Sequence, residues 1–229
     1  KDLETVQKRL ETAAKQARGG DTASRIQKEV LERLQRELEA GRRASQITGS
    51  DKREEAGLLI HELGLLTAKA RIIVLNASEG QVQERWQPPP ELRAEMRNDA
   101  WLSLSAKVED ELNSLPPGER AEYLRSLGMS ESGLDQLIQV SYRTLGLITF
   151  LTTGEDETRA WTIPAGSAAP RAGRAVHSDF EEKFIRAEVI PYPKLIEAGS
   201  WNHGRELGWI RTEGRDYAVQ DGDVIEFRI

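Results

Sequence analysis

The spacing of hydrophobic residues changes twice along the 229-residue chain, and this change constrains the fold more than any other feature. In residues 1–40 apolar side chains recur at steps of three and four, the period of an amphipathic helix. A continuous apolar run rich in β-branched residues follows at 71–76, and from Ile148 the pattern becomes short strands separated by turns. We therefore expect an α+β, multi-domain protein with parts at 1–66, 67–146 and 147–229.

Residues 1–66 are expected to form a helical arm. Its first two helices each carry a narrow apolar stripe, which favours a projecting antiparallel coiled coil over a buried bundle. A glycine pair supplies the turn between them, and a polar side chain caps the second helix. The expected positions are helices at 1–18 and 22–40, the turn at Gly19-Gly20, the cap at Asp21 or Thr22, and a third helix at 52–66.

Residues 67–146 show a strand–helix–strand–helix order. The apolar run "RIIVLN" is typical of a central strand in an α/β sheet, and "AWLSLSA" alternates leucine with serine as a second strand would. Two strands are too few for a complete sheet. The expected strands are 71–76 and 100–106, and the expected helices are 91–97, 107–113, 117–127 and one that Ser130 caps and that runs to Leu147.

Residues 147–229 are expected to form a small mixed sheet packed on one helix, an α+β arrangement of β-grasp type. Strands are predicted for "ITFLTT", "RAWTIP" and "RAEVI", and "DYAVQDGDVIEF" is predicted as a hairpin with Asp221-Gly222 at its turn. Short helices are expected at 177–184 and 192–198. The expected core residues are Phe180, Phe184, Ile185, Val189 and Phe227.

Composition excludes several kinds of site. The chain has no cysteine, so disulfides, thiolate metal sites and thiol redox switching are excluded. Its three histidines lie far apart, so no zinc site is expected. There is no run of 18 apolar residues, so a cytoplasmic protein with neither a membrane nor DNA as partner is expected.

The net charge of −6 is unevenly distributed. Residues 1–50 hold 11 basic and 8 acidic side chains, whereas the rest of the chain holds 21 basic and 30 acidic ones. The N-terminal part is therefore the better candidate for contact with a polyanion such as ribosomal RNA. The alternative is a helical arm with ordinary solvated charges.

Two short loops follow the two predicted strands of the middle part. They are Asn76-Ala77-Ser78-Glu79 and Ser105-Ala106-Lys107. Loops at the carboxyl ends of parallel strands are where α/β folds bind nucleotides. The alternative interpretation of the first loop is a simple helix start, with Ser78 as the N-cap.

Three segments of the last part resemble one family. They are "RAWTIP" (159–164), "HSDFEEKFIRAEVI" (177–190) and "EGRDYAVQDGDVIEFRI" (213–229). Together they resemble the C-terminal TGS domain of the Obg-like ATPase family, in its YchF branch. The resemblance continues more weakly through the two loops and the helical arm to Lys1.

The resemblance implies a role for the two loops. P-loop GTPases carry Asn-Lys-x-Asp and Ser-Ala-Lys at these places, and the Asp accepts two hydrogen bonds from guanine. Here Glu79 takes the place of the Asp and Ala77 that of the Lys, which resembles the ATP-preferring YchF branch. The resemblance implies that the Asn76 amide and the Ala77 backbone meet the adenine edge and that Ser105-Ala106 backs the base.

The family's activity depends on a P-loop, and no Gly-x-x-x-x-Gly-Lys-Ser/Thr stretch occurs in these 229 residues. We therefore expect the C-terminal part of a YchF-type ATPase, a remnant of its P-loop NTPase domain included; a P-loop in the reading frame before Lys1 would decide this question. ATP and Mg²⁺ are implied as cofactors of the intact protein, and the ribosome as its partner. For this chain alone we expect neither tight ATP binding nor turnover, and we assign it no catalytic residue.

Two other functions stay open. One is a stand-alone RNA- or ribosome-binding adaptor without nucleotide chemistry, and the other is a structural module that binds a protein through its coiled coil. Candidate RNA contacts are cations of the last part, some near Trp161, Trp201 and Trp209, although ordinary surface cations are the alternative. These cations are Arg159, Arg171, Arg174, Lys183, Arg186, Arg211 and Arg215. His177 and Asp179 are interpreted as structural, with Asp179 as a capping or first-turn acid.

Overall fold

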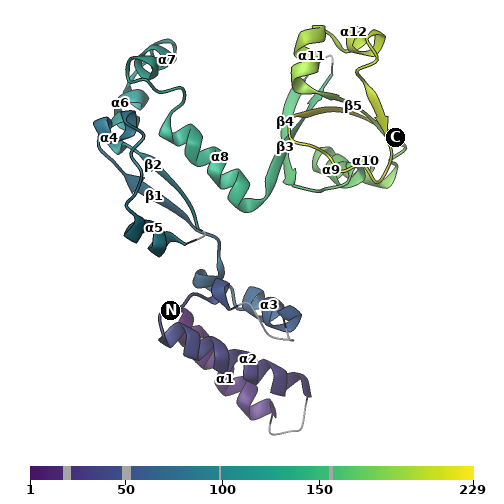
Figure 1. Ribbon diagram of the computed structural model, residues 1–229. Coiled ribbons are helices and arrows are strands. Elements are labelled where there is room, and N and C mark those ends of the chain that lie inside the picture. The colour runs from purple at the N-terminus through teal and green to yellow at the C-terminus, as the bar shows by residue number, and fades with distance from the viewer. Residues whose placement is uncertain (18–21, 48–52, 98, 155–156) are drawn as a thin grey trace. The chain divides into compact units, whose positions relative to one another are not determined.

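The computed structural model describes residues 1–17, 22–47, 53–97, 99–154 and 157–229 (Figure 1). The chain divides into two compact units, Lys1–Arg71 and Ile72–Ile229. Among the described residues, no helix is long and apolar enough to cross a membrane.

The first unit is helical, as its periodicity predicts. Its elements are α1 (Asp2–Ala17), α2 (Thr22–Glu39), the short 3₁₀ helix η1 (Ala44–Gln46), α3 (Arg53–Glu62) and a second 3₁₀ helix, η2 (Leu66–Ala68). Val6 of α1 and Leu31 and Leu34 of α2 are fully buried, and Leu59 of α3 joins the same cluster. The predicted Gly19-Gly20 turn and Asp21 lie outside the described residues. The coiled-coil character of this arm stays a prediction.

The second unit begins with two parallel strands, as the sequence predicts. β1 (Ile72–Asn76) pairs with β2 (Ala100–Leu104), with Val74 opposite Leu102. Leu102 is buried, but Val74 is 44% exposed, so the apolar run of β1 is only partly covered. The helices of this segment are α4 (Glu79–Gln83), α5 (Pro90–Met96), α6 (Ala106–Ser114), α7 (Pro117–Ser126) and α8 (Gly133–Leu145).

Helix α8 begins two residues later than predicted. Its N-cap is Ser132 and not Ser130, because the Ser132 hydroxyl accepts a hydrogen bond from the Asp135 N–H and Asp135 closes a capping box. Glu109 of α6 also accepts from the Gly133 N–H at 2.7 Å. At Gly133 a Cβ would lie 2.5 Å from the Cβ of Leu104, so only glycine allows α8 to approach β2 this closely.

Residues 147–229 form a five-stranded mixed sheet in the order β4-β3-β7-β5-β6. β3 and β7 pair in parallel and the other neighbours are antiparallel. The strands are β3 (Leu147–Thr153), β4 (Thr158–Pro164), β5 (Arg186–Pro191), β6 (Arg211–Glu213) and β7 (Asp223–Arg228). The helices are α9 (Ala169–Val176), α10 (Ser178–Glu182), α11 (Tyr192–Ala198) and α12 (Trp201–Glu206); α9 and α12 are not predicted from the sequence.

The predicted hairpin at "DYAVQDGDVIEF" is wrong. β7 lies between β3 and β5, and its predicted partner segment bonds elsewhere. The carbonyl of Tyr217 accepts from the Ala169 N–H, and the Val219 N–H donates to Ser167. The Asp223 carboxylate accepts from the Tyr217 hydroxyl and so holds this segment as a loop against the start of β7.

One face of this sheet carries the core. Phe150, Val189 and Phe227 are buried there, and the rings of Phe150 and Phe227 meet edge to face with centroids 5.9 Å apart. Of the predicted core residues, Phe184 is also buried and Phe180 packs against the cluster. Ile185 is a wrong prediction: it is 63% exposed, because successive side chains of extended chain point to opposite faces and its neighbour Phe184 takes the inner position.

Candidate functional site

The loops after β1 and β2 lie side by side. The Ala106 N–H donates a hydrogen bond to the side-chain oxygen of Asn76 at 3.1 Å. The Ala77 N–H donates to the Leu104 carbonyl at 2.8 Å. Parallel pairing puts the carboxyl ends of both strands at one edge of the sheet, and these two bonds join the loops there.

These bonds determine which polar groups of the first loop are left for a ligand. The Asn76 side-chain oxygen and the Ala77 N–H are both used within the protein. Among the described residues, the Asn76 side-chain NH₂ and the Ala77 carbonyl have no hydrogen-bond partner. The loop thus offers one donor and one acceptor, which match a ring nitrogen and an exocyclic amine such as those of adenine.

Ser78 and Glu79 begin a helix that the main sequence interpretation omits. The Ser78 hydroxyl accepts from the Gln81 N–H, and the Gln81 side chain accepts from the Ser78 N–H, which completes a capping box. The alternative interpretation of Ser78 as an N-cap is therefore confirmed. Glu79 is the first residue of α4 and its carboxylate accepts from the Gln83 side chain at 3.3 Å. The spacing Ser-x-x-Gln is the signal that locates α4 in the sequence.

The second loop is held by its own helix. Ser105 is buried, and its hydroxyl caps α6 by accepting from the Val108 N–H. Ala106, the first residue of α6, is exposed beside Asn76. Lys107, the third residue of this loop, forms an ion pair with Glu111 one turn further along α6, at 3.6 Å.

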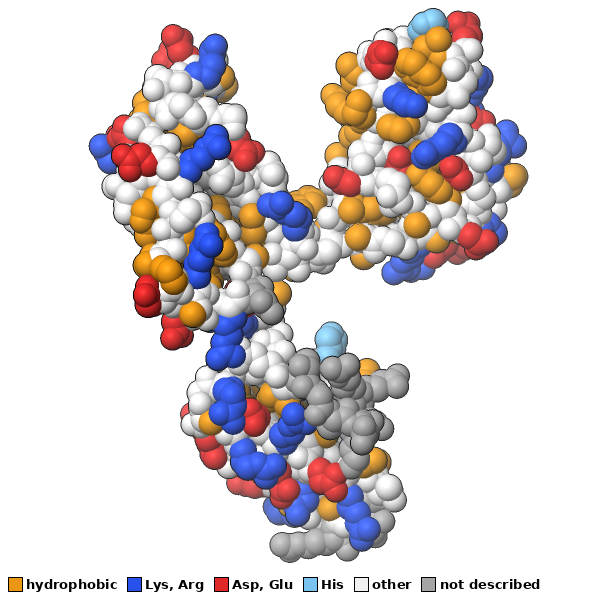
Figure 2. Space-filling model, viewed as in Figure 1, with side chains coloured by type: hydrophobic (Ala, Val, Ile, Leu, Met, Phe, Trp, Pro, Cys, Tyr) orange, Lys and Arg blue, Asp and Glu red, His pale blue; other side chains and the backbone are white. Residues whose placement is uncertain are grey.

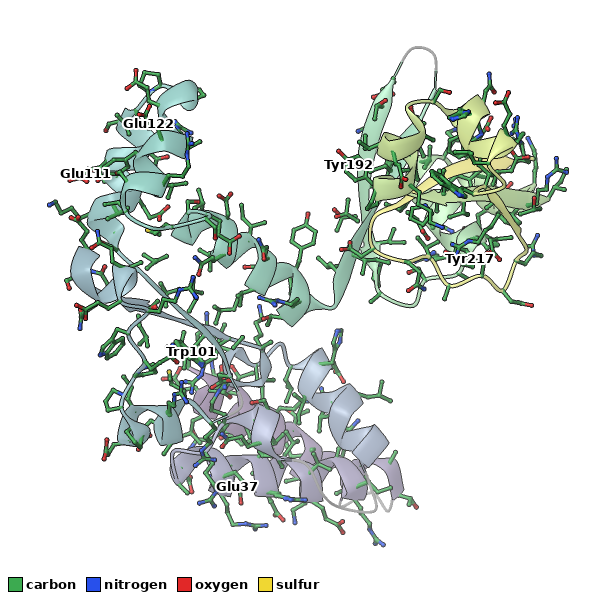
Figure 3. The ribbon with its side chains drawn as sticks, turned by 45° about the horizontal axis from the view of Figure 1, so that its top comes forward. Glu37, Trp101, Glu111, Glu122, Tyr192 and Tyr217 are labelled. Atoms are coloured by element: carbon green, nitrogen blue, oxygen red, sulfur yellow. The ribbon has the colours of Figure 1, made fainter. Side chains whose placement is uncertain are left out.

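Helices α6 and α7 meet through a tyrosine–carboxylate contact. The Tyr123 hydroxyl donates to Glu111, which Figure 3 labels. This hydrogen bond, burial and the charges of Glu111 and Glu79 raise the pKa of Tyr123 to about 12. Tyr123 is therefore a neutral hydrogen-bond donor near pH 7, and it supports the helix that carries Ser105 and Ala106.

Most of the candidate RNA-binding cations of the last part are engaged within the protein. The ion pairs join Arg174 to Glu181 at 2.8 Å, Lys183 to Asp179 at 2.8 Å and Arg211 to Glu213 at 3.3 Å. Arg215 donates to the Phe184 carbonyl at 3.1 Å. Figure 2 shows acidic and basic side chains interspersed on the visible face of this part.

Glu188, a buried residue of β5, gathers three arginines of the C-terminal part. Its carboxylate lies 2.7 Å from Arg205, 3.3 Å from Arg228 and 3.6 Å from Arg186. Burial alone raises the pKa of Glu188, but the hydrogen bonds and charges of Arg228 and Arg205 outweigh it and hold that pKa below its ordinary value. Arg186 is therefore part of a structural ion-pair cluster.

Arg159 is the candidate that keeps an arrangement suited to RNA. Its guanidinium lies over the Trp161 ring at 4.4 Å and its nearest carboxylate, Glu157, is 3.9 Å away. Arg171 also lies 3.9 Å from a carboxylate, that of Glu181. At Trp209 the cation over the ring is Lys194 and not an arginine.

His177 and Asp179 have structural contacts. The imidazole of His177 is the N-cap of α10 and accepts from the Asp179 N–H at 3.2 Å. Asp179 lies in the first turn and pairs with Lys183, whose hydrogen bond lowers the pKa of the carboxyl. The prediction of Asp179 as a first-turn acid is confirmed.

Residues 147–229 match a family model described as "YchF-GTPase_C: Protein of unknown function (DUF933)". Over 99% of its length the chain is similar to "Ribosome-binding ATPase YchF" of Bacillus subtilis (strain 168), with 39% identity over 233 residues and 62% of that protein covered. It is also similar to "Obg-like ATPase 1" of Caenorhabditis elegans, with 35% identity over 234 residues, 100% of this chain and 58% of that protein.

A solved structure covers almost the same stretch. "Structure of the Schizosaccharomyces pombe YchF GTPase" matches 99% of this chain and 62% of that chain, with a TM-score of 0.81 and 30% identity. The mixed α/β fold of this chain thus matches that YchF structure. The chain spans 62% of the length of the first curated relatives it matches.

Proposed function

Because this chain belongs to the YchF family, we propose that it forms the C-terminal part of a YchF-type, ribosome-associated ATPase of the cytoplasm. In this proposal residues 1–66 are the coiled-coil arm, 67–146 belong to the nucleotide-binding domain and 147–229 are the TGS domain. The names of the relatives disagree on the nucleotide, because one is called a GTPase and others ATPases. The proposal of ATP rather than GTP therefore rests on the residues of the loop after β1.

The joined loops at Asn76 and Ala106 are the observation that supports this choice best. The free NH₂ of Asn76 would donate to a ring nitrogen of adenine, and the Ala77 carbonyl would accept from its amine. Glu79 is one methylene longer than the Asp of guanine-specific loops, and its carboxylate is already bonded to Gln83. The backbone at Ser105-Ala106 would support the base from the other side.

The phosphates and Mg²⁺ need groups that these 229 residues do not supply. Phosphoryl transfer requires a cradle of backbone N–H groups, a lysine on the phosphates and a magnesium ligand, and this sequence has no P-loop. When bound, Mg²⁺ would neutralise the phosphate charge. The chain by itself should neither bind ATP with micromolar affinity nor hydrolyse it.

Nuclear magnetic resonance of this chain tests the base site. With ATP at millimolar concentration, the backbone signals of Ala77 and Ala106 and the side-chain NH₂ signal of Asn76 should shift, and GTP should shift them much less. The Asn76→Ala variant should lose the backbone shifts, whereas Asn113→Ala, on an exposed residue of α6, should keep them. Equal shifts with GTP would refute adenine reading, and calorimetry showing micromolar ATP affinity would refute the need for a P-loop.

Ribosome association is proposed through the basic arm and through Arg159 with its Trp161 stack. Co-sedimentation with ribosomes should weaken as salt rises, because phosphate contacts release counterions. Arg159→Gln should reduce binding at moderate salt, whereas the matched control Lys183→Gln, whose cation pairs with Asp179, should not. Salt-independent binding would favour the structural module that contacts a protein.

The second candidate function is a stand-alone RNA- or ribosome-binding adaptor, which the Arg159 guanidinium over the Trp161 ring would support without any nucleotide. The two proposals differ in the nucleotide arm of the test. An adaptor would sediment with ribosomes while its Asn76 loop shows no response to ATP.

A further inference from the structure

A cavity of about 430 Å³ opens beside β2, and no residue of the two base loops lines it. Three consecutive strand residues, Trp101, Leu102 and Ser103, line it. Neighbouring side chains of a strand point to opposite faces of the sheet. Three consecutive residues can therefore line one cavity only where that cavity reaches the edge of the strand. In the described part of the chain β2 pairs with β1 alone, so its other edge is open.

The backbone of β2 presents hydrogen-bonding groups at this open edge. The Leu104 carbonyl accepts from Ala77, at the end of β1, so Leu104 directs its backbone groups toward β1. Successive residues of a strand direct these groups to alternate edges. Trp101 and Ser103 therefore direct their N–H and C=O away from β1, and among the described residues these groups have no partner.

The walls of the cavity are rich in primary amides. One wall is the end of α4 and the segment after it, with Gln83 and Gln87, and the other is α8, with Gln136 and Gln139. A glutamine amide both donates and accepts, as a peptide group does. Among the described residues the Gln136 side chain has no hydrogen-bond partner.

The charge of the cavity is positive. Arg85 and Arg143 line it, and neither side chain forms an ion pair or a hydrogen bond with a described residue. Glu131 is the lining carboxylate, and it already accepts from Gln139 at 2.8 Å. Two guanidiniums without partners are complementary to an acidic ligand.

We propose that this edge groove binds an extended peptide segment of a partner protein that carries acidic side chains. The segment would add a strand to β2 through the outward groups of Trp101 and Ser103, a known mode of peptide recognition. Its acidic side chains would pair with Arg85 and Arg143, and the amide of Gln136 would bond one of its free backbone groups. This site goes beyond the proposed function, since it needs neither nucleotide nor ribosome.

Fluorescence anisotropy on this chain tests the proposal. The probe is a labelled, end-capped peptide of about six residues that alternates Val with Glu, the length of an ordinary strand. It should bind, and N-methylation of alternate backbone amides should weaken binding by about tenfold because the edge hydrogen bonds are lost. Replacing its Glu by Gln should weaken binding by a similar factor.

Protein variants locate the site. Arg85→Gln and Arg143→Gln should each weaken binding about fivefold, because each removes one charge-assisted contact. Arg125→Gln, an exposed arginine of α7 that does not line the cavity, is the matched control and should bind as well as the parent chain.

Three outcomes would overturn the proposal. They are the absence of binding, an N-methylated peptide that binds as well as the parent peptide, and arginine variants that bind like Arg125→Gln. If a nucleoside monophosphate binds with the same dependence on Arg85 and Arg143 while the peptide does not, the cavity is a nucleotide site instead. The outcome of the nuclear magnetic resonance test with ATP does not affect peptide binding. Either proposal can therefore be refuted without the other.

Discussion

The sheet of residues 147–229 and the β1–β2 sheet differ in how completely their strands are covered. The C-terminal sheet buries Phe150, Val189 and Phe227 on one face under α9 and α10. The β1–β2 sheet buries Leu102 but leaves Val74 44% exposed and one edge of β2 open. Among the described residues, neither hydrophobic cluster contains a member from 72–146.

The difference shows what strand number does for stability. Each fully buried large apolar side chain contributes about 1.5–3 kcal/mol, and five strands provide a face wide enough to bury many of them. Two strands do not, so the middle segment depends mainly on α8 to cover its strands. Local unfolding should therefore begin in 72–146 and reach 147–229 last.

The largest expected effect is at the centre of the C-terminal core. Phe150→Ala should lower the unfolding free energy of 147–229 by about 3–5 kcal/mol, because it leaves a cavity beside Phe227. Val74→Ala should cost at most about 0.5 kcal/mol, since that side chain is half exposed. Amide hydrogen exchange resolved by segment measures both. Similar losses would show that the two sheets are equally well covered.

The next effect is at the contact between α8 and β2. Gly133→Ala should cost about 3 kcal/mol, because the new Cβ would collide with Leu104 and Glu109. The matched control is Gly118→Ala in α7, where a Cβ meets nothing within 4 Å and the change should be neutral or slightly stabilising. Urea unfolding followed by circular dichroism compares them. Equal behaviour of the two variants would show that α8 does not support β2.

A smaller effect concerns the ion-pair cluster around Glu188 in the C-terminal sheet. Glu188→Gln should cost about 2 kcal/mol at pH 7, because three arginines lose their shared carboxylate. The pKa of Glu188 lies below the ordinary value of 4.5, so its contribution is complete above that pH and is lost as pH falls through the lowered pKa.

Urea unfolding at a series of pH values checks this. The difference between the parent chain and Glu188→Gln should be constant near neutrality and should shrink below about pH 4.5. A difference that grows on acidification would contradict the lowered pKa.

The smallest effect distinguishes two serines at the start of α8. Ser132→Ala should cost about 1 kcal/mol, because it removes the hydroxyl that accepts from Asp135. Ser130→Ala, the cap that the sequence predicts, should change the unfolding free energy very little. Thermal unfolding of both variants measures the difference, and a larger cost at Ser130 would place the cap where the sequence predicts it.

Local patterns in the sequence predict many of the elements. The apolar runs at 71–76 and 186–190 locate β1 and β5, and α11 occupies the predicted residues 192–198. Patterns fail where a distant segment competes for hydrogen bonds. The hairpin before β7 is absent because residues 217–219 bond to 167–169, which no local pattern reveals.

The candidate site shows the same limit. The spacing of Asn76 and Ser105 after two strands predicts loops at one edge of a parallel sheet, and the structure joins them through Asn76 and Ala106. The spacing does not predict that this bond uses the Asn76 side-chain oxygen and leaves the side-chain NH₂ for a ligand. That depends on a contact across 30 residues of chain.

The sequence by itself determined the order of helical arm, α/β segment and mixed sheet, together with the family and the absence of a P-loop motif, because periodicity and motifs depend on neighbouring residues. Only the tertiary structure decided which strand lies beside which, that Ile185 faces outward and that Gly133 lets α8 approach β2. It also decided that, among the described residues, one edge of β2 is open next to two arginines without partners. The physical reason is that burial and hydrogen bonding are settled between segments far apart in the chain, where the local pattern has no influence.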